Sequence, residues 1–168
     1  VSDNVLTNLD LSSNNNLEVL DANENELSSI DITGASQLST LNLSDNDVSS
    51  LDLSAFPNLE EINLLSNDLT DLNLQNGANG NITNLNLLLN DDLRCVLGDD
   101  ENIVNTATVS TEPNTRFSSV SCDYTAVPDA NFEIALFNLG YDDYSVDGQV
   151  PTSYINTVTS LDVSNDNI

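Results

Sequence analysis

Residues 17–37 read LEVLDANENELSSIDITGASQ, and residues 38–58 read LSTLNLSDNDVSSLDLSAFPN. The two segments align without a gap, and each contains the apolar pattern L-x-x-L-x-L, or a close variant of it, twice. Apolar residues that alternate along an extended chain face one side of a strand, and a single short strand cannot bury that side alone. The repeat therefore predicts a stack of coils, each 21 residues long and built from two half-units.

The same pattern continues on both sides of these two units. Its middle apolar residues are Leu9, Leu20, Ile30, Leu41, Leu51, Ile62, Leu72 and Leu85. We expect a continuous right-handed solenoid over residues 6–93, within a first domain at 1–93. Its parallel strands should be centred on Leu20, Leu41, Ile62 and Leu85. Because both half-units have strand-like alternation, the back of each coil should be extended rather than helical.

One asparagine recurs at the same place in successive units: Asn25, Asn46, Asn67 and Asn90. A side-chain amide can both donate and accept hydrogen bonds, which suits the bend inside a coil. We expect a buried ladder of structural asparagines. The alternative is an exposed row that binds a ligand.

The pattern L-x-x-L-x-L-x-x-N-x-L resembles that of the leucine-rich-repeat family, and the 21-residue period resembles its short bacterial class. This resemblance implies a parallel-β solenoid with an extended back side. It covers nearly the whole chain when the segments after the repeats are included.

The leucine repeat pattern stops after Leu93. Residues 94–123 should form a carboxyl-terminal cap over the exposed end of the solenoid. Cys95 and Cys122 flank this segment, and a disulfide between them would pin it. Two buried unpaired thiols are the alternative. A disulfide indicates an oxidising extracellular or cell-surface location.

Residues 124–157 are expected to form a small helical cap of a following repeat array. Pro128 and Asp129 would begin a helix, Phe132, Leu136 and Leu139 would line one face, and Gly140 would end it. A second short turn is expected after Pro151. This segment resembles the amino-terminal cap of internalin-type surface proteins and of leucine-rich-repeat proteins exported by type IX secretion.

The last segment, VTSLDVSNDNI at 158–168, returns to the repeat pattern and should be the first strand of a further array. We expect it to complement the half-unit at 6–16, with residues 1–5 as a bulge between them. On this hypothesis the chain is about one period of a head-to-tail array.

Charge excludes several function classes. The chain has 28 acidic and 2 basic residues, a net charge of −26, and no histidine. Nucleic acid and anionic membranes would repel such a surface. The absence of histidine excludes serine–histidine and cysteine–histidine catalysis and histidine zinc sites. No apolar run is long enough for a membrane span, so membrane insertion is not expected.

One segment is a candidate calcium loop. Asp143, Ser145, Asp147 and Gly148 match the D-x-S-x-D-G opening of an EF-hand loop, but Tyr154 stands where the bidentate glutamate belongs. Asp142 could supply the missing oxygen. An ordinary acidic turn is the alternative, and no other cofactor is predicted.

Two leucines, Leu65 and Leu88, form a candidate contact patch on an otherwise polar front face.

Taken together, these features lead us to expect a non-catalytic repeat module of a large secreted bacterial surface protein, used for adhesion or for building an extracellular fibre through contacts between modules. Its partners would be copies of itself or neighbouring modules. The alternatives are a module that recognises a protein or a surface glycan through the repeat face, attached to an enzyme elsewhere in the parent chain, and, with least support, a carboxylate hydrolase.

Overall fold

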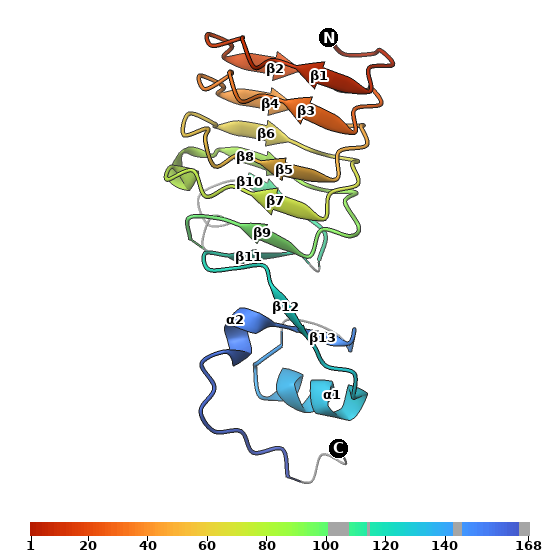
Figure 1. Cartoon of the computed structure of the whole chain (residues 1–168), viewed down its shortest axis with the longest axis vertical. Helices are drawn as coiled ribbons and strands as arrows, with labels where there is room; N and C mark the ends of the chain where they lie inside the picture. Colours follow the sequence, from red (N-terminus) through yellow and green to blue (C-terminus); the bar gives the residue numbers. More distant parts are fainter. Residues whose placement is uncertain (101–107, 114, 143–145, 165–168) are drawn as a thin grey trace. The chain divides into compact units, whose positions relative to one another are not determined.

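The computed structural model describes residues 1–100, 108–113, 115–142 and 146–164. It divides into two compact units, residues 1–119 and 120–168. The first unit is a parallel-β solenoid, as the repeat predicted, and the second is a small mixed α/β unit (Figure 1).

The front of the solenoid is a parallel sheet in the order β10-β8-β6-β4-β2. Its strands are β2 (Val19–Asp21), β4 (Thr40–Asn42), β6 (Glu61–Asn63), β8 (Asn84–Asn86) and β10 (Thr108–Ser110). Leu20, Leu41, Ile62 and Leu85 lie opposite one another in successive strands. The four expected strand centres are therefore in parallel register.

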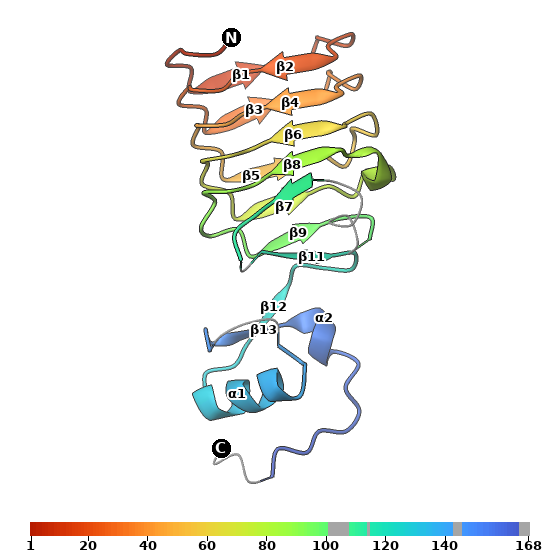
Figure 2. The ribbon, with the colours of Figure 1, turned by 180° about the vertical axis from the view of Figure 1, so that it is seen from behind.

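The back of the solenoid is also extended, and it consists of two sheets. One pairs β1 (Asn8–Asp10) with β3 (Ser29–Asp31). The other has the order β11-β9-β7-β5 and contains β5 (Ser50–Asp52), β7 (Asp71–Asn73), β9 (Cys95–Leu97) and β11 (Arg116–Ser118). The two faces enclose the core between them (Figure 2).

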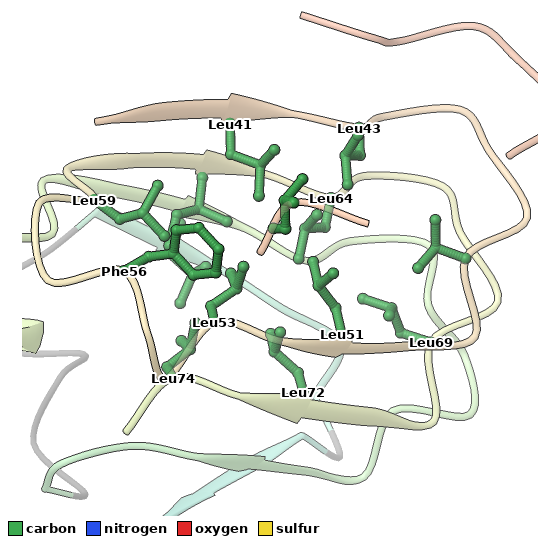
Figure 3. Close-up of a cluster of buried hydrophobic side chains, with 14 of the residues drawn as sticks. Leu41, Leu43, Leu51, Leu53, Phe56, Leu59, Leu64, Leu69, Leu72 and Leu74 are labelled. Atoms are coloured by element: carbon green, nitrogen blue, oxygen red, sulfur yellow. The ribbon is translucent and has the colours of Figure 1, made fainter. Parts of the chain in front are cut away.

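The core consists mainly of the leucines that the repeat places inward. Leu41, Leu43, Leu53, Leu64 and Leu69 are fully buried. Figure 3 shows these side chains converging from both faces, with the ring of Phe56 among them. Burying a leucine side chain contributes about 1.5–3 kcal/mol, so the core is the main source of stability.

The solenoid continues beyond residue 93, where the sequence pattern suggested that it would stop. β10 pairs with β8 and β11 pairs with β9, both in parallel, so residues 94–118 contribute further strands to both faces. Val96 is buried and Val109 and Phe117 are partly buried against the same core. Valine and phenylalanine replace leucine here, so the leucine pattern in the sequence ends before the solenoid does.

Residues 1–5 do not form the expected bulge. The backbone N–H groups of Asp3 and Asn4 donate to the carbonyl oxygens of Asn23 and Glu24, at 3.1 Å each. The next coil repeats these bonds, from Glu24 to Ser44 and from Asn25 to Asp45. Residues 1–5 therefore occupy the same half-unit that the pattern at 158–168 matches, and the expected complementarity of the two segments is wrong.

The second unit combines one longer helix, a short helix and two strands. α1 spans Ala130–Asn138, α2 spans Thr152–Ile155, and β12 (Tyr124–Ala126) pairs antiparallel with β13 (Gln149–Pro151). Asp129 caps α1 by accepting from the N–H groups of Asn131 and Phe132. The helix and its start agree with the sequence, whereas the antiparallel pair was not expected.

Leu139 does not line the buried face of α1, contrary to the sequence-based expectation. The helix ends at Asn138, Leu139 is its C-cap residue, and 48% of Leu139 is exposed. Glu133, Ala135 and Leu136 are the buried residues of the helix. The helical period cannot extend to a residue beyond the last turn, and Gly140 there adopts a positive φ of 79°.

Residues 158–164 form no strand and are mostly exposed. The end of the expected strand at 158–168 lies outside the described residues.

Candidate functional site

The recurring asparagines bind the coils to one another. The Oδ1 atom of Asn46 accepts from the N–H of Leu27 at 3.0 Å, and its Nδ2 donates to the carbonyl oxygens of Ala22 and Leu43 at 3.0 and 3.1 Å. Asn67 and Asn90 repeat all three bonds one and two coils further on. Asn46, Asn67 and Asn90 are buried, and Asn25 is half-buried. The amides of the three buried asparagines are therefore used by the backbone and are not presented to a ligand.

The residue before each of these asparagines has a left-handed backbone. The φ angles of Glu24, Asp45, Ser66 and Leu89 lie between 52° and 57°. Asp3 has the same conformation, and the Nδ2 of the following Asn4 donates to the carbonyl oxygens of Val1 and Ser2. Asn4 is thus an additional residue of this type, which the leucine pattern missed because no L-x-x-L-x-L precedes it.

The front face is a polar sheet with a shallow hollow of about 300 Å³ over β2, β4 and β6. Asn42 donates to Asp21 and Asn63 donates to Asn42, each from Nδ2 to Oδ1 at 3.0 Å. The column beside them contains Val19, Thr40, Glu61 and Asn84 in register. This face offers amides, carboxylates and a hydroxyl to a ligand, and no aromatic ring.

Leu65 and Leu88 lie just after β6 and β8, on adjacent coils. The N–H of Ser66 donates to the carbonyl oxygen of Leu88 at 2.9 Å. Leu65 is half-buried and Leu88 is 37% exposed. Leu89, which the sequence analysis did not single out, is 60% exposed beside them.

Aspartates on the back face close turns. Asp10, Asp31 and Asp52 each accept, through Oδ1, the N–H of the residue two positions later, at 2.9–3.0 Å. The Ser12 hydroxyl and its N–H lower the pKa of Asp10. These carboxylates therefore have a structural use at the end of each back strand.

Cys95 and Cys122 are joined in a disulfide, as expected from their positions. Cys95 begins β9 and is buried, and Cys122 lies two residues before β12.

The candidate calcium loop is only partly described, because Asp143 and Ser145 lie outside the described residues. Asp142 is buried, and the N–H groups of Asp147 and Gly148 donate to Oε1 of Glu133 at 2.7 and 2.8 Å. Glu133 is 1% exposed and was not foreseen as a member of this loop. The part of the chain that the structure describes contains no group of three or more acidic or cysteine side chains that could hold a metal, so calcium binding stays a prediction.

The second unit contains an apolar groove of about 440 Å³, here called the cap groove. It is lined by Thr125, Ala126, Val127, Phe132, Leu136, Ile155, Val158, Thr159, Ser160 and Leu161. Val127 and Leu136 are buried in this unit's small core, whereas 39% of Leu161 is exposed.

Comparison with solved structures identifies the fold. The functional domain of InlJ from Listeria monocytogenes, described as including a cysteine ladder, matches 70% of this chain with 24% identity and a TM-score of 0.51. The chain has the leucine-rich-repeat fold. This leucine-rich-repeat chain spans 30% of the Listeria chain. It has only two cysteines, so the ladder in its own coils consists of asparagine amides.

No protein-family model matches the sequence, and no curated protein matches it. Among the helices that the structure describes, none is long and apolar enough to cross a membrane.

Proposed function

We propose that this chain is a non-catalytic module of a large secreted bacterial surface protein, in which leucine-rich-repeat modules associate for adhesion or to build an extracellular fibre. The observation that carries the proposal is the cap groove, an open apolar surface beside a segment with the repeat pattern. The disulfide supports an oxidising extracellular location.

The segment beside the cap groove has the local geometry of a coil. Ser164 donates its N–H and its hydroxyl to Oδ1 of Asp162, at 3.0 and 2.6 Å. Asp10 and Asp31 close the same turn at the ends of β1 and β3. Residues 158–164 therefore have the turn of a repeat without its strand pairing.

The first coil of the solenoid carries apolar side chains that suit such a groove. β1 is an edge strand of its sheet, and an edge strand can pair with another chain. Val5 and Val19 are 76% and 59% exposed there, and Leu9 is only partly buried. An exposed apolar end and an apolar groove favour contact between modules.

Sedimentation velocity of the full chain over a range of concentration and salt tests this proposal. We expect reversible association that strengthens with salt, because salt screens repulsion between chains of charge −26. Leu161→Asp in the cap groove should abolish association. Ile134→Asp is the matched control, because Ile134 is 43% exposed and does not line the groove.

A monomer at all concentrations, or equal loss in both variants, would contradict association through the cap groove.

The second candidate is recognition of a protein or glycan through the front face, and the polar hollow over β2, β4 and β6 favours it. Hydrogen-bonding amides and carboxylates suit sugar hydroxyls. A glycan array with the full chain tests this function. Asn63→Ala should remove a positive signal, whereas Asn58→Ala, outside the hollow, should not.

A further inference from the structure

The back of the solenoid is interrupted between the coils at 17–37 and 38–58. β1 pairs with β3 and β5 pairs with β7, but no pairing joins β3 to β5, although all residues of both strands are described. On the front, the same two coils pair through β2 and β4. The step from β3 to β5 is visibly wider than the steps beside it (Figures 1 and 2).

Backbone hydrogen bonds define the interruption atom by atom. Where the back strands do pair, a backbone bond follows each strand. After β1 the N–H of Leu11 donates to the oxygen of Asp31 at 2.7 Å, and after β5 the N–H of Leu53 donates to the oxygen of Asn73 at 2.8 Å. The equivalent groups at the interruption, the N–H of Ile32 and the oxygen of Asp52, both belong to described residues and are not joined. The facing edges of β3 and β5 thus each carry backbone groups that are not paired with the other strand.

The two coils differ in side-chain volume beside the opening. Phe56 occupies the position that Ala35 occupies one coil earlier, five residues after the strand centre, and both are buried. Figure 3 shows the Phe56 ring inside the coil beside Leu59. Phe56 therefore adds the volume of a ring to one coil where the neighbouring coil has only a methyl group, and we attribute the opening to this mismatch.

Close packing on the other side of β3 acts in the same direction. A Cβ on Gly34 would lie 2.1 Å from the carbonyl oxygen of Ser12, so the backbones of these two coils approach as closely as glycine allows. On the back, β3 is therefore packed tightly against the first coil and is separated from β5, although the two coils are joined again before these strands by the N–H of Asp47, which donates to the oxygen of Leu27 at 3.0 Å.

The opening is a groove of about 430 Å³, here called the back groove. Apolar Ile30 and Leu51 line it together with the carboxylates of Asp31 and Asp52. Each carboxylate uses Oδ1 to close its own turn, which leaves Oδ2 for a ligand.

We infer that the back groove accepts an extended segment of a partner protein, which inserts as a strand between β3 and β5 and places a lysine or arginine side chain beside Asp31 and Asp52. Main-chain hydrogen bonds to both strand edges would give affinity, and the apolar and acidic side chains would give specificity. A second copy of this chain is a poor occupant, because it has 28 acidic residues and 2 basic ones. This inference does not depend on contacts between modules, because the groove belongs to a single solenoid.

Fluorescence anisotropy with a labelled Thr-Val-Lys-Val-Thr peptide tests the inference. We expect saturable one-to-one binding to the full chain. The double variant Asp31→Asn, Asp52→Asn keeps the turn acceptors and should bind about tenfold more weakly, since each exposed charge pair contributes up to about 1 kcal/mol. Asp10→Asn is the matched control, because Asp10 closes the same turn outside the groove.

A peptide of the same charge with N-methylated valines separates strand insertion from general attraction to an acidic protein, and it should not bind. Phe56→Ala should let β3 and β5 approach and abolish binding, with circular dichroism to show that the variant folds. Should it unfold, hydrogen exchange on the unmodified protein provides the test. The amides of Ile32 and Ser49 should exchange rapidly in the free chain and slowly with peptide, while that of Leu53 stays protected.

Unchanged anisotropy, equal binding of the N-methylated peptide, or Ile32 protection equal to that of Leu53 in the free chain would overturn the inference.

Discussion

In this protein, the side chains of the ladder asparagines form hydrogen bonds between coils, in addition to those of the paired strands. Asn46, for example, bonds to backbone groups in two coils, and its loss leaves the N–H of Leu27 buried without an acceptor. The same position holds an aspartate, Asp166, in the final segment of the sequence.

Asn46→Ala should lower the free energy of unfolding by about 1–3 kcal/mol, because it leaves the buried N–H of Leu27 without an acceptor, whereas the oxygens of Ala22 and Leu43 keep their bonds from Asn25 and Asn67. Urea denaturation followed by circular dichroism measures the change. Asn58→Ala is the control, since Asn58 is exposed and makes one long bond of 3.5 Å. Equal effects of the two substitutions would contradict the structural role of Asn46.

Like charges meet at the left-handed turns. A hydrogen bond shared with Asp3 raises the pKa of Glu24, and the negative charges of Asp3 and Asp45 act in the same direction. Because the folded chain holds this proton more firmly than the unfolded chain, the contribution of Glu24 to stability falls as pH rises from its ordinary pKa through the raised one.

Asp3→Asn should therefore lower the pKa of Glu24 toward its ordinary value, because it removes the carboxylate that shares a hydrogen bond with protonated Glu24 and, with it, a negative charge. An NMR titration of the Glu24 carboxyl carbon measures this pKa. Asp71→Asn, which is not among the causes of the shift, should leave it unchanged.

At the scale of the elements, each strand has three residues and gains its stability from its neighbours. Leu41→Ala should cost about 2–5 kcal/mol as a core truncation, because Leu41 is fully buried at the centre of β4. Thermal or urea unfolding measures the loss. Val19→Ala on the exposed front column should change stability by less than about 0.5 kcal/mol.

The loop after α1 depends on a buried carboxylate. Glu133→Ala should destabilise the second unit by about 1–3 kcal/mol, because the N–H groups of Asp147 and Gly148 lose their acceptor. Proteolysis of this unit at increasing urea measures the effect.

Calcium is predicted to bind in the same loop. A melting temperature that calcium raises and a chelator lowers would support calcium binding, and a melting temperature that neither changes would contradict it.

At the scale of the whole molecule, one covalent bond joins residues that lie far apart in the sequence. Replacing Cys95 and Cys122 together by serine should lower stability by about 2–4 kcal/mol, chiefly because the unfolded chain gains freedom. Denaturation of the oxidised protein, the reduced protein and the double variant measures the difference. Equal midpoints in all three would show that the bond does not constrain the unfolded chain.

The repeat determined by itself that this chain forms a solenoid and which leucines fill it. Alternation is a local property: Leu41 and Leu43 must share one face of a strand whatever their neighbours are. The start of α1 could be predicted for the same reason, since the Asp129 cap acts on the N–H groups of Asn131 and Phe132 close by in the chain.

Only the tertiary structure decided where the solenoid ends and where its back opens. The strands β10 and β11 extend it without the leucine pattern, because any apolar residue of suitable size can fill the last coil. We attribute the opening between β3 and β5 to Phe56, whose equivalent in the neighbouring coil is Ala35. The sequence shows both residues, but their effect depends on packing between coils, across 21 positions of sequence, which no pattern along one strand contains.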